Sequence, residues 1–370
     1  MAHQDFRRTM ATAVQHIAAT AFLAGATFGA MAQGAPYAEG PLLEIIKEMP
    51  EGSWAKVNAN AWTPAALRPL YGSSSNPTPS KILGSWSSFA WDSKRGDLIL
   101  YGGGHANYSG NDVYRWRSRN LQWSRAALPS ETFFVGSNTW NAIDGADAAP
   151  TSAHTYDNAV YLPIADRYLN FGGAIYNTGG AYTRPDELIP GALRQTGPYL
   201  FDPSRADPDK VGGTTGSHVQ RVAPYADILG GNMWENRDIH KHLFHLTRPR
   251  SHINGCTAYN QSPEGHDVVF VAARTGGTAL DLYRYDLIDI DDPSFDELSR
   301  VGVYWSGPSG QTTCAHDPIL NIVLRTGTNA KPFYFWDLNP ERITNRDQRV
   351  AVVGSVRDLS DWLTDTGKAI

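Results

Sequence analysis

The most constraining feature of this sequence is a two-segment unit that occurs four times along the chain. In each unit a short apolar segment is followed, after a loop, by a segment rich in aromatic residues. The apolar segments are residues 97–101, 167–171, 267–272 and 321–325. The aromatic segments are residues 113–116, 198–202, 282–286 and 333–337. Short apolar runs bounded by turn residues predict β-strands, so each unit predicts a hairpin and the chain predicts an all-β fold. Residues 42–49 are the best helix candidate, and that segment is short.

Glycines follow the apolar segments in every unit. Three of the segments run into paired or tripled glycine, and the fourth has a single one. These sequences are Gly102-Gly103-Gly104, Gly172-Gly173, Gly276-Gly277 after Arg274-Thr275, and Thr326-Gly327. Because glycine accepts positive φ, it permits a sharp exit from a strand. The first units also carry long inserted loops, and loops of that size usually carry function.

The order of apolar strand, Gly-Gly, variable loop and aromatic strand with tyrosine resembles the kelch repeat of galactose-oxidase-like propellers, over residues 84–355. The resemblance implies a β-propeller, in which sheets stack as blades because a single sheet cannot cover both of its faces. Four clear units are fewer than kelch proteins usually have. Either an irregular blade lies within residues 203–250, or the propeller is incomplete or truncated at the C-terminus. We favour the second interpretation, since closure protects strand edges.

The N-terminal residues differ from the rest of the chain. Arg7 and Arg8 precede an apolar run over residues 17–28, and Ala30-Met31-Ala32 matches a signal-peptidase cleavage site. The apolar run is too short to span a membrane, and no second one follows. We therefore predict a removable signal peptide and a secreted or periplasmic protein without membrane insertion.

These observations divide the chain into three parts: a signal peptide over residues 1–32, an extended lead-in over 33–83, and propeller blades over 84–370. We expect the lead-in to complete a blade. The formal net charge of −5 offers no basic field, so we do not expect nucleic acid as a partner. We expect a monomer.

The loop after the first apolar segment is the densest cluster of polar side chains. It reads Gly-Gly-Gly-His-Ala-Asn-Tyr-Ser-Gly-Asn and contains His105, Asn107, Tyr108 and Asn111. In a propeller such loops form the rim where ligands bind, so these residues are candidates for catalysis and substrate binding. The alternative is that His105 only forms a hydrogen bond to a neighbouring blade.

A second candidate segment, residues 152–157, precedes the second hairpin at the expected start of a blade, near the axis. His154 and Tyr156 alternate along it, so in an extended strand both would face one cavity. The alternative is polar packing between blades.

The Gly-Gly-Gly-His loop and the later His-Thr-Tyr segment together resemble propeller-type polysaccharide lyases, above all the ulvan lyases. That family cleaves uronic-acid polysaccharides by β-elimination, with His and Tyr as acid and base and Arg neutralising the carboxylate. The resemblance implies catalytic roles for His105, Tyr168 and Arg184. His154 substitutes for the family's second histidine, which has no clear counterpart here. The alternative for Tyr168 is a packed core residue.

A third cluster is the histidine- and arginine-rich segment 240–252. His240, His242, His252 and Cys256 are candidate ligands of a structural zinc or calcium ion. Alternatively, Arg248 and Arg250 belong to a cationic strip that binds acidic sugars, or the segment is a solvated loop. Cys256 and Cys314 could instead form a disulfide; the sequence leaves this open.

The function expected from these features is an exported lyase that cleaves acidic polysaccharide by β-elimination and needs no cofactor. Two alternatives belong to other classes. One is a non-catalytic kelch propeller that binds a glycan or a protein. The other is a copper-radical oxidase, which requires a tyrosine cross-linked to a cysteine.

Overall fold

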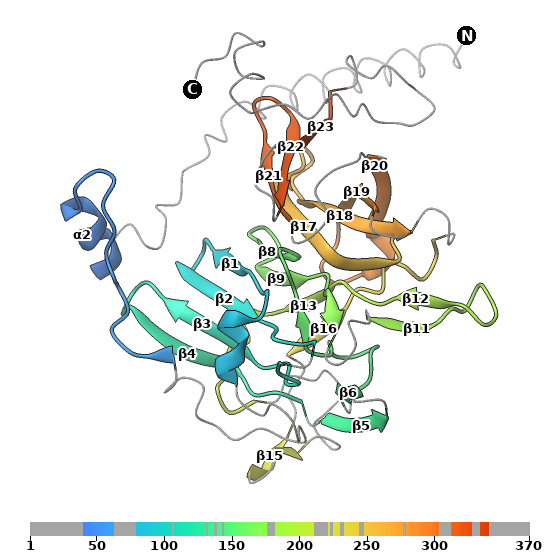
Figure 1. Ribbon diagram of the computed structural model, residues 1–370, viewed down its shortest axis with the longest axis horizontal. Helices are drawn as coiled ribbons and strands as arrows, with labels where there is room; N and C mark the ends of the chain where they lie inside the picture. The colour runs from blue at the N-terminus through green and yellow to red at the C-terminus, as the bar shows by residue number, and fades with distance from the viewer. Residues whose placement is uncertain are drawn as a thin grey trace, which may run out of the picture.

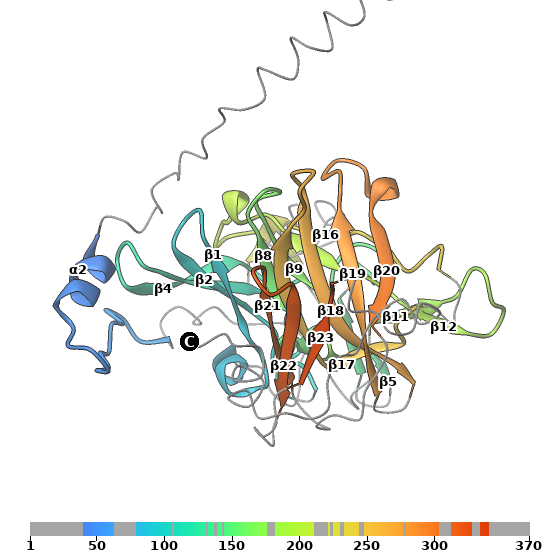
Figure 2. The same cartoon turned by 90° about the horizontal axis from the view of Figure 1, so that it is seen from above.

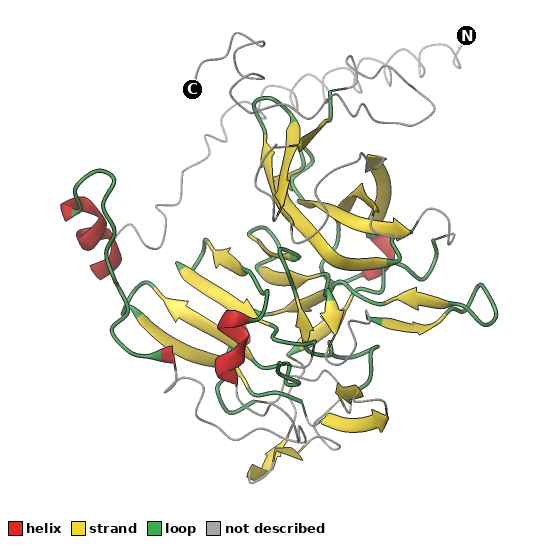
Figure 3. Cartoon of the chain, viewed as in Figure 1, coloured by secondary structure: helices red, strands yellow, loops and turns green. Residues whose placement is uncertain are grey.

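The computed structural model describes most of the chain from residue 40 to residue 339 (Figure 1). The described residues are 40–62, 79–105, 107–130, 132–136, 139–142, 144–175, 182–210, 221–222, 225–229, 233–243, 248–276, 279–302, 312–327 and 334–339. They form four antiparallel sheets arranged as a four-blade β-propeller with very little helix (Figure 3). The all-β prediction is therefore confirmed. The predicted signal peptide lies outside the described residues.

The first two blades each contain four strands. Blade 1 consists of β1 (Phe89–Asp92), β2 (Asp97–Tyr101), β3 (Val113–Arg117) and β4 (Gln122–Ala127), paired in chain order. Blade 2 consists of β8 (Ala159–Leu162), β9 (Arg167–Asn170), β13 (Tyr199–Phe201) and β16 (Trp234–Asn236), also paired in chain order.

The third and fourth blades complete the arrangement. Blade 3 consists of β17 (Ser251–Gln261), β18 (Asp267–Gly276), β19 (Ala279–Leu287) and β20 (Glu297–Gly302). Blade 4 consists of β21 (Thr312–Asp317), β22 (Ile322–Gly327) and β23 (Tyr334–Asp337). Strands β17 and β21 of these neighbouring blades lie side by side (Figures 1 and 2). Each predicted hairpin thus forms the centre of one blade or, in blade 4, its last two described strands.

Short elements lie between the blades. The hairpin β5 (Thr132–Gly136) and β6 (Thr139–Ala142) follows blade 1, and β7 (Ala153–His154) precedes blade 2. Loops of blade 2 hold the remaining strands: β10 (Ala174–Ile175), β11 (Thr183–Pro185), β12 (Leu193–Gln195), β14 (Arg221–Val222) and β15 (Tyr225–Leu229). Two 3₁₀ turns, η2 (Pro203–Arg205) and η3 (Pro293–Phe295), lie in loops of blades 2 and 3. Within residues 203–250 the described strands form the β14–β15 pair and the outer strand of blade 2, not a further blade.

The lead-in contains the predicted helix, α2 (Pro41–Glu48), and the 3₁₀ segment η1 (Pro79–Gly84). Asn60 extends the edge of blade 1, since its side chain exchanges hydrogen bonds with the backbone of Trp123 at 2.7 and 2.9 Å. Trp62 packs against Tyr114 and Trp123. No helix among the described residues is long and apolar enough to cross a membrane.

The cores lie between blades, as the sequence pattern of β18 illustrates. Residues 268–273 are apolar without interruption, and successive side chains of a strand point to opposite faces. The even-numbered side chains pack in the cluster shared with blade 4, and the odd-numbered ones pack in the cluster shared with blade 2. A strand buried on both faces therefore reads as a continuous apolar run.

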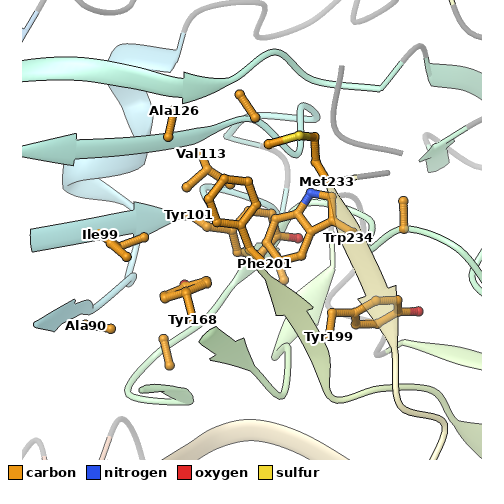
Figure 4. Close-up of a cluster of buried hydrophobic side chains, with 14 of the residues drawn as sticks. Ala90, Ile99, Tyr101, Val113, Ala126, Tyr168, Tyr199, Phe201, Met233 and Trp234 are labelled. Carbon is orange, nitrogen blue, oxygen red and sulfur yellow. The ribbon is translucent and has the colours of Figure 1, made fainter. Parts of the chain in front are cut away.

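Aromatic side chains fill the space between blades 1 and 2 (Figure 4). The ring of Trp234 lies 5.1 Å from that of Tyr101 and 5.4 Å from that of Phe201, measured between centroids. Tyr101 comes from blade 1, whereas Trp234 and Phe201 come from blade 2. Phe201, from the aromatic segment of the second repeat, thus takes part in the packing between these two blades.

Candidate functional site

A group of aromatic and polar side chains surrounds His154 where blades 1 and 2 meet. The centroid of the His154 ring lies 4.9 Å from that of Trp86, 5.1 Å from His105 and 6.2 Å from Tyr156. Asn107 joins them through a hydrogen bond to His154. We call these five residues the histidine cluster. It brings together the two segments that the sequence singled out, residues 102–111 and 152–157.

The glycines of the repeat make this approach sterically possible. A Cβ atom on Gly104 would lie 2.4 Å from the Cα of Ala153, and one on Gly173 would lie 1.9 Å from the carbonyl oxygen of His154. Strand β7 therefore fits between two glycine-containing loops. The loop of His105 is tied to the second of them, because its backbone N–H donates to the carbonyl of Ile175 at 3.0 Å.

Three members of the histidine cluster have left-handed backbones. The φ angles are 53° at His105, 47° at Trp86 and 51° at Tyr156. Bulky side chains are uncommon in this region of φ, and such strain gathers at functional sites.

The hydrogen bonds of Asn107 define the tautomer of His154. The Asn107 amide nitrogen donates to the His105 carbonyl at 3.3 Å and contacts Nε2 of His154 at 2.8 Å. A carbonyl oxygen only accepts hydrogen bonds, so the Asn107 atom beside it is the amide nitrogen. That nitrogen only donates, so Nε2 of His154 accepts from it and carries the lone pair. The proton of the neutral ring lies on Nδ1.

Burial and neighbouring charges set the protonation states of the cluster. Burial, together with the positive charge that His105 can carry, lowers the pKa of His154 to about 4, so this ring is neutral at neutral pH. Burial raises the pKa of the Tyr156 phenol, and the nearby charge of Arg274 opposes that rise. Arg274, at the end of β18, thus brings a cation to the cluster from blade 3.

The histidine cluster is exposed to solvent on one side and buried on the other. Trp86 is 51% exposed and His105 is exposed, whereas His154 is only 2% exposed. Tyr156 and Arg274 are partly exposed. The Nε atom of Arg274 is buried and finds no acceptor among the described residues. The arrangement offers an apolar ring, an imidazole, a phenol and a cation to a bound molecule.

Comparison with known proteins adds little to this description. No protein-family model matches the sequence. No curated protein matches it either. A similar solved structure is the α-L-arabinanase of Penicillium chrysogenum in complex with arabinobiose, at 11% sequence identity and a TM-score of 0.28. The match covers 70% of this chain and 80% of that one. A similarity this low does not indicate a shared activity.

Three other predicted site residues are buried and bound within the protein. Tyr108 is fully buried, and its hydroxyl donates to Asp112 at 2.7 Å. The Asn111 amide donates to Ser130 and to the carbonyl of Pro150, both at 3.0 Å. Tyr168 packs near Trp234 in the core between blades 1 and 2. Their surfaces are not open to a substrate, so the packed-core alternative describes Tyr168 better than a catalytic role.

The predicted arginines lie around the β11–β12 hairpin. Arg184 pairs with Asp147 and with Glu187, the latter at 3.0 Å. Arg248 is buried and pairs with Asp186, and Arg250 is exposed. No hydrogen bond, ion pair or ring contact among the described residues joins Arg184 to the histidine cluster; the arginine whose charge acts on Tyr156 is Arg274.

The predicted metal ligands do not form one set. Cys256 is bonded to Cys314, so it cannot provide a thiolate ligand. Neither sulfur is then available for the tyrosine cross-link of a copper-radical oxidase. His240 and His252 are buried with ring centroids 5.9 Å apart, whereas His242 is exposed. In the described part of the chain, no group of three or more His, Cys, Asp or Glu side chains could hold a metal ion.

Sequence reasoning missed Arg274 and Trp86. Arg274 had a signal, since it stands just before the glycine pair of the third unit, at the same end of its strand as the loop of His105. Equivalent strand ends of a propeller meet on one side of the molecule. Trp86 had no comparable signal.

Proposed function

We propose that the protein acts on an acidic polysaccharide and cleaves it by β-elimination at the histidine cluster. The observation that carries this proposal is the packing of His105 and Tyr156 around the buried His154, with the charge of Arg274 acting on Tyr156. The kelch-type repeat and the Gly-Gly-Gly-His loop, which resembles that of ulvan lyases, agree with it. The predicted signal peptide would place the protein where such polymers occur.

Three side chains, those of Arg274, His105 and Tyr156, suit the steps of an elimination. The guanidinium of Arg274 neutralises the uronate carboxylate, which makes the C5 proton easier to remove. The imidazole of His105 takes that proton. The electron pair of the C5–H bond then forms the C4–C5 double bond while the C4–O4 bond breaks. The phenol of Tyr156, kept protonated by its raised pKa, returns a proton to O4. The step requires no further reactant.

The remaining members of the cluster support these groups. His154 stays neutral because of its lowered pKa, so it adds no positive charge beside His105. Its hydrogen bond to Asn107 connects the ring to the loop that carries His105. The exposed indole of Trp86 offers a flat apolar surface to the C–H face of a sugar ring.

A second candidate function is binding of an acidic glycan without cleavage. The observation that favours it is the exposed indole of Trp86, a flat apolar surface that binding of a sugar ring alone would use. In that case Trp86 and Arg274 would hold a sugar, and no proton would be transferred.

The deciding experiment incubates the purified protein with ulvan, glucuronan and alginate and records the ultraviolet absorbance of unsaturated uronates. We expect the absorbance to rise on at least one polymer. No rise on any acidic polymer, combined with measurable binding, would replace the lyase with the second candidate.

Paired variants test the site assignment. Tyr156→Phe should lower the rate about 100-fold or more, in the range of general acid–base contributions. Tyr168→Phe, which removes a hydroxyl in the core, should leave the rate nearly unchanged. Arg274→Gln and Arg184→Gln form a second pair with the same contrast. Equal effects within either pair would contradict the assignment to the histidine cluster.

A further inference from the structure

A cavity of about 350 Å³ lies between the β11–β12 hairpin and residues 248–250. All the charged residues that line it are arginines: Arg194, Arg248 and Arg250. The remaining lining residues are neutral. The carboxylate of Glu187 pairs with Arg194, and that of Asp186 pairs with Arg248. Neither carboxylate lines the cavity. Among the described residues, the cavity is therefore lined by guanidinium groups and by no carboxylate.

The three arginines differ in the donors that they still offer. The Arg194 guanidinium uses its donors on Glu187, Asp238 and the carbonyl of Gln195. Arg248 pairs with Asp186. Arg250 is exposed, and no carboxylate among the described residues pairs with it. Arg194 and Arg248 are thus neutralised by carboxylates, and Arg250 is the cation that remains open to a ligand.

The cavity is connected to the histidine cluster through the backbone of blade 3. The Arg250 N–H donates to the carbonyl of Arg274 at 2.6 Å, and Arg274 is the residue whose charge acts on Tyr156. Gln195 holds the other side of this segment, because its amide donates to the Arg250 carbonyl at 2.6 Å. Two arginines with open donors, Arg250 and Arg274, therefore lie on adjacent backbone segments.

We propose that this cavity is an anion subsite that binds the carboxylate or sulfate group of a second sugar residue in the chain held at the histidine cluster. The proposal rests on the proposed function and specifies its substrate as a polymer with repeated negative charges. A carboxylate or sulfate matches the forked donors of a guanidinium. The subsite would therefore select polyanionic glycans over those with an isolated acidic residue.

The test measures binding by calorimetry in a Tyr156→Phe background, so that the ligand is not cleaved. The ligands are an oligoglucuronate, which carries only carboxylates, and a sulfated galactan oligosaccharide, which carries only sulfates. Adding Arg250→Gln should weaken binding of at least one ligand about tenfold or more, as expected for a charge-assisted hydrogen bond. The ligand that is affected identifies the anionic group.

The matched control is Arg119→Gln, which removes an exposed arginine from the turn between β3 and β4. It should leave binding of both ligands unchanged. Unaltered affinity of the Arg250→Gln protein for both ligands would overturn the subsite, even if the wild type proves to be a lyase. Loss of binding with Arg250→Gln in a protein without lyase activity would retain the subsite and remove only the catalytic step.

Discussion

At the scale of single residues, we expect the buried histidines between blades 2 and 3 to lower the stability of the fold in acid. His252 is 1% exposed and packs against Phe171, with ring centroids 5.0 Å apart. Neither its ring nitrogens nor those of His240 find a hydrogen-bond partner among the described residues. Burial lowers the pKa of His252 to about 3, and that of His240 is lowered too.

The lowered pKa of His252 predicts loss of stability in acid. Between pH 6.5 and 3 the unfolded chain binds a proton that the folded protein does not, so the free energy of unfolding falls as pH falls. We expect His252→Phe, which keeps an aromatic ring beside Phe171, to reduce the stability difference between pH 7.5 and pH 5 by about 2 kcal/mol. Urea unfolding at the two pH values measures it.

The control for this prediction is the exposed His242, changed to Gln, which should leave the pH dependence unaltered. Asp157 acts in the opposite direction, because burial raises the pKa of its carboxyl to about 6. That contribution is common to wild type and variant and cancels in the comparison. An identical pH dependence of wild type and His252→Phe would contradict the prediction.

At the scale of elements, strand β7 depends on close contact with the glycine loop after β9. Ala174 of β10 pairs with His154 of β7, and Gly173 leaves no room for a side chain next to the His154 carbonyl. The position of the histidine cluster thus follows from backbone contact between two short strands.

Changing Gly173 to Ala should displace β7, because the new methyl group would overlap the His154 carbonyl. We expect a destabilisation of about 1–3 kcal/mol, measured by urea unfolding, and weaker binding of acidic oligosaccharides. Gly84→Ala is the matched control, since a Cβ there meets no atom within 4 Å. Equal stability of the Gly173→Ala and Gly84→Ala proteins would show that β7 tolerates the displacement.

At the scale of the whole molecule, ties between blades hold the propeller together. The Cys256–Cys314 disulfide joins β17 of blade 3 to β21 of blade 4 across 58 residues of sequence. Asp157, at the start of blade 2, adds a polar tie, since its carboxylate accepts hydrogen bonds from Thr313 and from the backbone of Cys314. The segment next to the histidine cluster is thereby connected to blade 4.

Removing the disulfide should destabilise the fold, chiefly because the crosslink restricts the unfolded chain. We expect the Cys256→Ala, Cys314→Ala double variant to lose about 2–4 kcal/mol in urea unfolding. A reductant should lower the stability of the wild type to a similar extent and leave the double variant unchanged. A wild type whose stability is indifferent to reductant, in a sample shown to be reduced, would contradict this expectation.

Much of the architecture could be predicted because it depends on neighbours in the chain. Three patterns extend over only a few residues: the alternation of side chains along a strand, the glycines that end a strand, and the aromatic segment that pairs with it. The strands at 97–101 and 113–116 were therefore predicted closely. Burial on both faces is also visible, in the unbroken apolar run of β18. The segments of His105 and His154 were recognised for the same reason, as polar side chains at strand ends.

Which side chains meet at the site depended on contacts between distant parts of the chain. Trp86 and His105 meet His154 from segments distant in the chain, whereas Tyr168 packs in the core between blades. Arg274 enters from blade 3, and Cys256 bonds to a cysteine of blade 4. A local pattern specifies that a strand forms and which residues end it. The packing of one blade on the next selects the partners, because that geometry arises only when sheets distant in sequence are stacked.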